Sequence, residues 1–161
     1  MNADTKTMLT EEQMAKMIDA VGKGLPVADA VNMSPEVLES LYALAHKHYT
    51  AQNYKDAHIL FEALCMYKYN DSRFWMGLAA CRQALGFYKE AADTFGAAGL
   101  MTNFKNPEPL WYAANCYLKL NDKESALGVL GGMLAICDVN NASHMTYKAK
   151  GEALQEHLQS K

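Results

Sequence analysis

The sequence predicts an all-α fold in which three similar helix pairs stack into a solenoid, with one helix before them and one after. Three observations carry this prediction. Half of the 161 residues are hydrophobic, so the chain can bury a core. Prolines are few and so are runs of β-branched residues, which favours helices over strands. The segments NYKDAHILFEAL, beginning at Asn53, and FYKEAADTFGAA, beginning at Phe87, echo one another 34 residues apart.

The 34-residue period continues when the chain is aligned on the small residue that opens each second helix. These residues are Ala57, Ala91 and Ala126, with gaps of 34 and 35. The alignment places Phe61, Phe95 and Leu130 four positions later, and Ala45, Ala79 and Ala114 twelve positions earlier. Antiparallel helices cross closely only where small residues occupy the crossing and larger ones fill the spaces beside it. The pattern resembles the tetratricopeptide repeat, which implies a right-handed solenoid.

The boundaries of the predicted elements follow from this alignment and from local signals. We expect helix pairs at residues 35–68, 72–102 and 107–138, with turns at AQN, LGF and LND. Ser34 and Pro35 form a helix start, because Ser can cap the backbone and Pro has no N–H to leave unpaired. A last helix at 142–159 should cap the stack, since a terminal repeat has no neighbour on its outer side. The repeats therefore occupy 34–140, and the capping segment occupies 141–161.

The first 33 residues precede the repeats, and residues 1–9 have the composition of a loose tail. A helix follows that Gly22 and Gly24 can end. It places an apolar stripe on one face, here called the N-terminal stripe: Met14, Met17, Ile18 and Val21. The core of three repeats does not need this stripe, so we expect it to mediate self-association. Packing of the stripe on the first repeat of its own chain is the alternative.

Several classes of protein are disfavoured by the composition. A formal net charge of −3 and only two arginines, Arg73 and Arg82, leave no basic surface for nucleic acid. No run approaches the roughly 18 apolar residues of a membrane span, so no stable membrane insertion is expected. No secretory signal is visible, and the four cysteines form no CxxC, which fits a reducing cytoplasm.

No catalytic or metal-binding motif stands out, and we expect neither an enzyme nor a cofactor. HExxH, P-loop and GxSxG patterns are absent from the sequence. His46 and His48 lie two residues apart on a helix and point in different directions, so they cannot bind one metal ion together. Cys81 and Cys116 fall beside the helix crossings, where a small buried hydrophobic residue is needed.

The first helix of each pair is expected to line the concave face of the solenoid. The predicted lining residues are Glu39, Tyr42, His46 and Tyr49 in the first pair, Arg73, Met76, Ala80 and Gln83 in the second, and Glu108, Trp111, Asn115 and Lys119 in the third. Aromatic and thioether side chains dominate these rows, which indicates a groove for an extended apolar peptide. Alternatively, Tyr42 and Tyr49 merely cover the neighbouring helix.

A more specific resemblance than that to the tetratricopeptide repeat comes from one segment, HILFEALCMYKYNDSRFWMGLAACRQALGFYKEA. Its F-x-x-L-C, D-S-R-F and G-L-x-A-C-R-Q motifs, with LYALAHKHY before them, resemble the class II chaperones of bacterial type III secretion. The likeness runs from about residue 14 to residue 135 and is most specific between 38 and 95.

This resemblance implies a function and a set of partners. Such chaperones hold two hydrophobic translocator proteins in the bacterial cytoplasm before export, and they bind a short N-terminal Pro-x-Leu-x-x-Pro type segment in the concave groove. The groove tyrosines of the family correspond to Tyr42, Tyr49 and Tyr54. Many members form homodimers through the N-terminal helix, and some assist a transcriptional activator.

Two other functions stay open at the level of the sequence. The protein could be a general tetratricopeptide scaffold that joins other proteins, or a co-regulator of the transcription of secretion genes. An enzyme is the third hypothesis, although the sequence offers no constellation of residues that would support catalysis.

Overall fold

The computed structural model describes residues 11–30 and 33–160. Every regular element in these ranges is an α-helix, as predicted. The helices are α1 (Glu11–Gly22), α2 (Val27–Ala30), α3 (Pro35–Thr50), α4 (Tyr54–Tyr67), α5 (Ser72–Ala84), α6 (Tyr88–Met101), α7 (Glu108–Lys119), α8 (Lys123–Ala135) and α9 (Ala142–Gln159). The predicted tail at residues 1–9 lies outside the described residues. The short helix α2 occupies a segment for which the sequence indicates only a connector.

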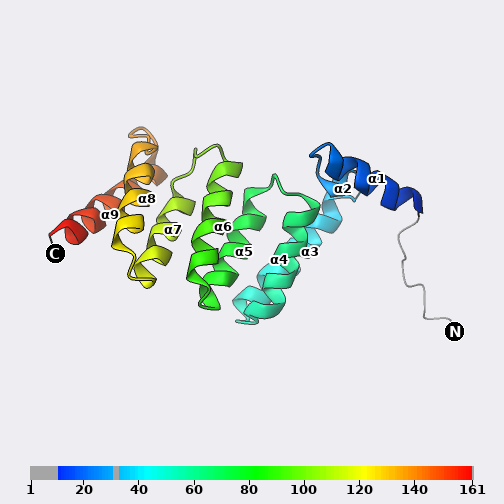
Figure 1. The fold of residues 1–161 in the computed structure, drawn as a ribbon, viewed down its shortest axis with the longest axis horizontal. Coiled ribbons are helices and arrows are strands. Elements are labelled where there is room, and N and C mark those ends of the chain that lie inside the picture. Colours follow the sequence, from blue (N-terminus) through cyan, green and yellow to red (C-terminus); the bar gives the residue numbers. More distant parts are fainter. Residues whose placement is uncertain (1–10, 31–32, 161) are drawn as a thin grey trace.

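The three predicted helix pairs are α3 with α4, α5 with α6, and α7 with α8, and they stand side by side in chain order (Figure 1). The chain thus forms an elongated stack in which each pair contacts the next, with α1 and α2 at one end and α9 at the other. The tetratricopeptide-like architecture predicted from the 34-residue period is confirmed.

Small residues do occupy the helix crossings. Ala57, Ala91 and Ala126 are fully buried, and so are Ala45, Ala79 and Ala114 on the facing helices. Beside them, Phe61, Phe95 and Leu130 are at most 2% exposed and fill the spaces that the alanines leave. The same alignment therefore explains both the close approach of the helices and the large side chains of the core.

The turn inside each pair has the same backbone geometry. Gln52, Gly86 and Asn121, again 34 and 35 residues apart, have φ of +63°, +84° and +57°. One left-handed residue reverses the chain after a helix, which brings the second helix back against the first. Only Gly86 adopts this conformation without steric cost from a Cβ atom.

Helix α9 packs against α8 and covers the end of the stack, as the sequence predicts. Gly151 on α9 is buried, and a Cβ atom there would overlap the side chain of Met133 on α8. Leu154 and Leu158 add partly buried apolar surface to this contact. Among the described residues, none of the helices is both long and apolar enough to cross a membrane.

Candidate functional site

A hollow of about 350 Å³ opens on the side of the solenoid that the first helices of the pairs form. Seven of the residues predicted to line the concave face lie around it: Tyr42, His46 and Tyr49 from α3, Arg73, Met76 and Ala80 from α5, and Glu108 from α7. Phe61, Ser72, Gly77 and Asn106 complete the lining. Residues from all three repeats therefore meet at one hollow, which is centred on the first two.

Other predicted binding residues lie outside this hollow. Tyr54 contacts Tyr49, with ring centroids 5.4 Å apart. The ring of Trp111 packs among side chains of α7, α8 and α9, and the Nζ of Lys150 lies 5.9 Å from its centroid. Asn115 donates a hydrogen bond to the Trp111 carbonyl at 2.7 Å. Gln83 is also absent from the lining. A role of these four residues in binding stays a prediction.

Tyr42 belongs to both the hollow and the core. Its ring lies 6.0 Å from Phe61 in an edge-on arrangement and 5.8 Å from Phe74, both measured between centroids. Tyr49 is likewise partly buried against the first core cluster. The two interpretations of these tyrosines are thus compatible, because one part of each ring covers the core while another part faces the hollow.

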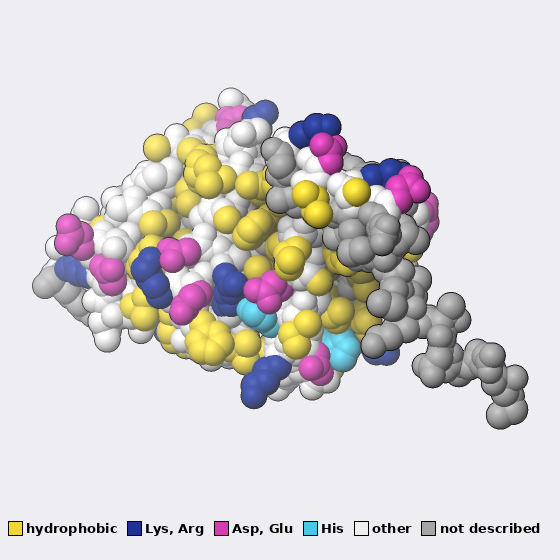
Figure 2. All heavy atoms as spheres, turned by 45° about the vertical axis from the view of Figure 1, so that its right-hand side comes forward, with side chains coloured by type: hydrophobic (Ala, Val, Ile, Leu, Met, Phe, Trp, Pro, Cys, Tyr) yellow, Lys and Arg dark blue, Asp and Glu magenta, His cyan; other side chains and the backbone are white. Residues whose placement is uncertain are grey.

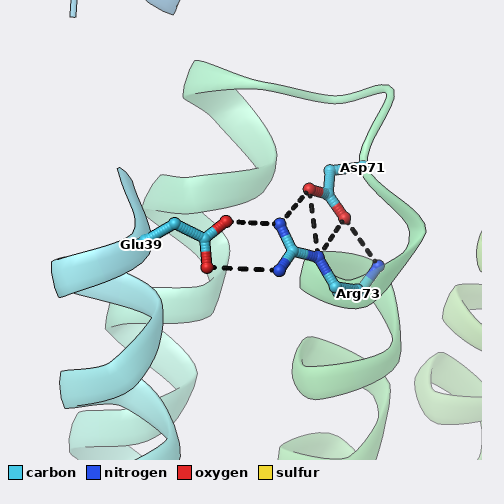
Figure 3. A network of polar contacts seen from close by, with 3 residues as sticks. All are labelled: Glu39, Asp71 and Arg73. Atoms are coloured by element: carbon cyan, nitrogen blue, oxygen red, sulfur yellow. Dashed lines mark hydrogen bonds and ion pairs between the residues drawn. The ribbon is translucent and has the colours of Figure 1, made fainter. Parts of the chain in front are cut away.

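Arg73 joins α3 to α5 at the edge of the hollow (Figure 3). Its guanidinium donates to both carboxylate oxygens of Glu39, at 2.6 and 3.2 Å, and to Asp71 at 2.7 Å. The Cζ atom also lies 5.1 Å from the centroid of the Tyr42 ring, within the range of a cation–π interaction. Arg73 therefore holds one side of Tyr42 while its own charge is neutralised.

The charges of this network shift the pKa values of its members. Hydrogen bonds to Asp71 and then to Glu39 raise the pKa of Arg73 well above its ordinary value. Burial by itself would raise the pKa of Asp71, but the hydrogen bonds and the charge of Arg73 outweigh burial, so that pKa is lowered. The hydrogen bond from Arg73 also lowers the pKa of Glu39. All three groups are consequently ionised near neutral pH.

Four residues of the hollow were not predicted from the sequence as lining residues: Phe61, Ser72, Gly77 and Asn106. Phe61 was predicted as a core residue, and it is both part of the core and part of the hollow. The sequence does contain a sign that Gly77 is unusual. The equivalent positions in the first and third pairs hold Ala43 and Tyr112, so the second pair alone has a glycine there. A glycine in a helix interior costs about 1 kcal/mol relative to alanine, so it calls for a packing reason.

The face of the molecule that Figure 2 shows has no large area of one charge among its described residues. In Figure 2, basic and acidic side chains lie interspersed among hydrophobic ones over the face in view. Exposed apolar residues include Ile59 and Met66 on α4 and Leu100 on α6.

The cysteines do not form a reactive site in the described residues. Cys65, Cys81 and Cys116 are buried. Burial raises the pKa of Cys65 and Cys81 to about 12 and that of Cys116 to about 11. These thiols therefore remain protonated at neutral pH and behave as small apolar side chains. The described residues also contain no group of three His, Cys, Asp or Glu side chains that could hold a metal ion.

The N-terminal stripe is described in part. Ile18 is 74% exposed on α1. The side chains of Met14, Met17 and Val21 lie outside the described part of the structure. The segment after α1 is tied to the repeats by the hydroxyl of Tyr69, which donates to the carbonyl of Gly24 at 2.8 Å.

No family model matches the sequence, but individual proteins do. The low calcium response locus protein H of Yersinia pestis is 36% identical over 133 residues, which cover 81% of this chain and 79% of that protein. The type III secretion translocator chaperone SycD of Yersinia enterocolitica has a TM-score of 0.74 at 32% identity, with 82% and 97% of the two chains covered.

A third similar protein, PcrH of Pseudomonas aeruginosa, has been solved in complex with the chaperone-binding region of PopD. It has a TM-score of 0.72 at 34% identity, with 80% of this chain and 95% of that chain covered. SycD has also been solved with a peptide of the translocator YopD and as an alternative dimer. By its sequence and its fold, this chain belongs to the family of the type III secretion translocator chaperones.

Proposed function

We propose that this protein is a chaperone that holds hydrophobic translocator proteins before their export, and that it binds a short apolar segment of each in the hollow between the first two repeats. The observation that carries the proposal is the lining of this hollow by Tyr42, Tyr49 and Met76 on the face where the sequence predicts a peptide groove. Membership of a family whose members SycD and PcrH bind translocator segments supports it.

The chemistry of the hollow suits reversible capture. Aromatic and thioether side chains offer a large apolar contact area, and methionine adapts to differently shaped ligands. Polar groups around the rim, including Ser72 and Asn106, can pair with the backbone of an extended peptide. A chaperone of this kind needs no energy source, because binding alone keeps apolar segments of the client away from other surfaces.

The cellular setting follows from the same proposal. Translocators have to be held on the side of the membrane from which they are exported, so we place the protein in the bacterial cytoplasm. The relatives are chaperones, and we propose no catalytic activity. A contact with a transcriptional activator, implied by the family resemblance, stays a prediction.

The test measures the affinity of fluorescent N-terminal segments of the translocators from the same secretion system. Replacing Tyr42→Ala together with Tyr49→Ala should weaken binding at least about ten-fold, because aromatic anchors at the centre of an interface often contribute about 2 kcal/mol or more. Since both rings also cover the core, thermal melts must show that the double variant is still folded at the temperature of the titration.

The matched control is Ile59→Ala together with Met66→Ala on the exposed side of α4, where the two side chains are 63% and 72% exposed. This control should bind as the wild type does. The groove is ruled out as the client site if the tyrosine variant is folded and keeps full affinity. Loss of affinity in the α4 variant alone would move the client to the opposite face.

We further propose that the N-terminal stripe mediates a homodimer. The high exposure of Ile18 supports this, because a solvated isoleucine on an amphipathic helix is available to a second copy. Removing residues 1–24 should halve the mass per particle in light scattering and leave the helical content of the repeats intact. An unchanged mass per particle would show that the stripe is not the dimer contact.

A further inference from the structure

The junction between the first and second repeats differs from the next junction in the residue that faces the buried phenylalanine. Phe61 and Phe95 occupy the same place in α4 and α6, 34 residues apart. Against Phe61 the following repeat presents Gly77, whereas against Phe95 it presents Tyr112, whose ring stacks on Phe95 with centroids 5.3 Å apart. In the first junction the following repeat places no ring at the equivalent position, and the hollow lies there.

Gly77 does more than leave this space empty. A Cβ atom on Gly77 would overlap three carbon atoms of the Phe61 ring, so the ring lies directly on the backbone of α5. Phe61 is 2% exposed and packs edge-on with Tyr42, whose ring also contacts Arg73. An additional methyl group at position 77 would therefore push the Phe61 ring away from α5, towards Tyr42 and the open space of the hollow.

We propose that Gly77 sets the depth of the hollow and thereby limits the size of the client side chain that the groove accepts. This inference rests on the proposed function, since it concerns the same groove. It makes Gly77 a specificity-determining residue that acts through the position of Phe61.

The hollow is large enough for such a selection. An apolar cavity of about 150 Å³ binds benzene, and the hollow measures about 350 Å³. It can therefore take one large apolar side chain together with part of the peptide backbone. Its lining includes the rings of Tyr42, Tyr49 and Phe61 and the charged side chains of Arg73 and Glu108. We expect the client to place one large apolar anchor here, while polar backbone groups remain at the rim.

The experiment combines substitution of Gly77 with substitution of the client. An alanine scan of the fluorescent translocator segment on the wild-type protein identifies the anchor, which is the residue whose truncation weakens binding most. Gly77→Ala should weaken the unmodified segment at least about ten-fold. Truncation of the anchor should weaken binding to Gly77→Ala by less than about three-fold, because the space for the anchor is already occupied.

A matched control and a rescue separate this effect from a general loss of structure. Gly96→Ala on α6 introduces a Cβ atom that meets nothing within 4 Å, so it should bind as the wild type does. Phe61→Leu combined with Gly77→Ala removes the overlapping ring atoms and should recover most of the lost affinity. Circular dichroism melts of all variants show which of them are folded during the titration.

The outcomes distinguish the inference from the proposed function. If the wild type binds no translocator segment, the proposed function fails and this inference fails with it. If the wild type binds but Gly77→Ala is folded and binds equally well, only the inference is overturned. An equal cost of anchor truncation in the wild type and in Gly77→Ala would also overturn it. If Gly77→Ala does not fold, the double variant Phe61→Leu with Gly77→Ala provides the test. The inference holds if this double variant binds the segment and binds it less tightly when the anchor is truncated, and it is overturned otherwise.

Discussion

The two junctions between successive repeats share one architecture but differ in what fills them. In each, a buried phenylalanine of the preceding pair faces the first helix of the next pair. Between α4 and α5 this phenylalanine, Phe61, lies over Gly77 beside an open hollow. Between α6 and α7 the corresponding Phe95 is covered by the stacked ring of Tyr112.

The two junctions also differ in the charged residues at their edges. Glu39, Arg73 and Glu108 occupy equivalent positions in the three pairs. Arg73 pairs with Glu39 across the first junction, and no ion pair joins it to Glu108 in the described residues. The first junction is thus held at its edge by an ion pair and left open inside, whereas the second is packed by an aromatic pair. A repeat fold can therefore provide a binding site at one junction and a rigid support at the next through very few substitutions.

The largest expected difference in stability between the two junctions concerns their buried phenylalanines. Phe95→Ala should lower the free energy of unfolding by about 3–5 kcal/mol, as for other buried aromatic truncations. Phe61→Ala should cost about 1 kcal/mol less, because its surroundings border an open hollow that can relax. Urea denaturation of the two variants measures the difference. A larger loss for Phe61→Ala would mean that the first junction is the more tightly packed one.

A smaller effect would sharpen the role of the ion pairs at the edge of the first junction. Arg73→Gln should lower the free energy of unfolding by less than about 1 kcal/mol, because the Arg73 side chain is 47% exposed and solvent screens its pairs. Arg73→Lys keeps the charge but loses the fork that reaches two carboxylates, so it should fall between wild type and Arg73→Gln.

The pH dependence of this difference tests its cause. The pKa of Asp71 is lowered in the folded protein from an ordinary value of 3.8. Its contribution to stability is therefore fully present above about pH 3.8 and is lost as the pH falls through the folded pKa. The stability difference between wild type and Arg73→Gln should shrink in acid. A difference that does not change between neutral pH and pH 3 would show that packing on Tyr42, rather than charge, carries the effect.

The helices of the three pairs, and the way in which they pair, could be predicted from the sequence. Ala57, Ala91 and Ala126 recur at the repeat spacing because every helix pair needs the same small residues at its crossing. This requirement is local and recurs in every pair, so it produces a pattern that can be recognised in the amino-acid sequence. The face that each first helix turns to the groove follows from the same period, which is why Tyr42, Met76 and Ala80 were predicted to line the same groove.

The folded structure was needed to show where along that face an unfilled hollow remains. The period assigned Trp111 to the same row as Tyr42 and Met76, but it could not show that side chains of α8 and α9 would pack around Trp111. Gly77 interrupts the pattern and was not predicted, and the period could not show that the ring of Phe61, sixteen residues earlier, would rest on it. Periodicity reports which side of a helix a residue occupies. Whether space remains there depends on side chains from other helices, and those contacts exist only once the chain has folded.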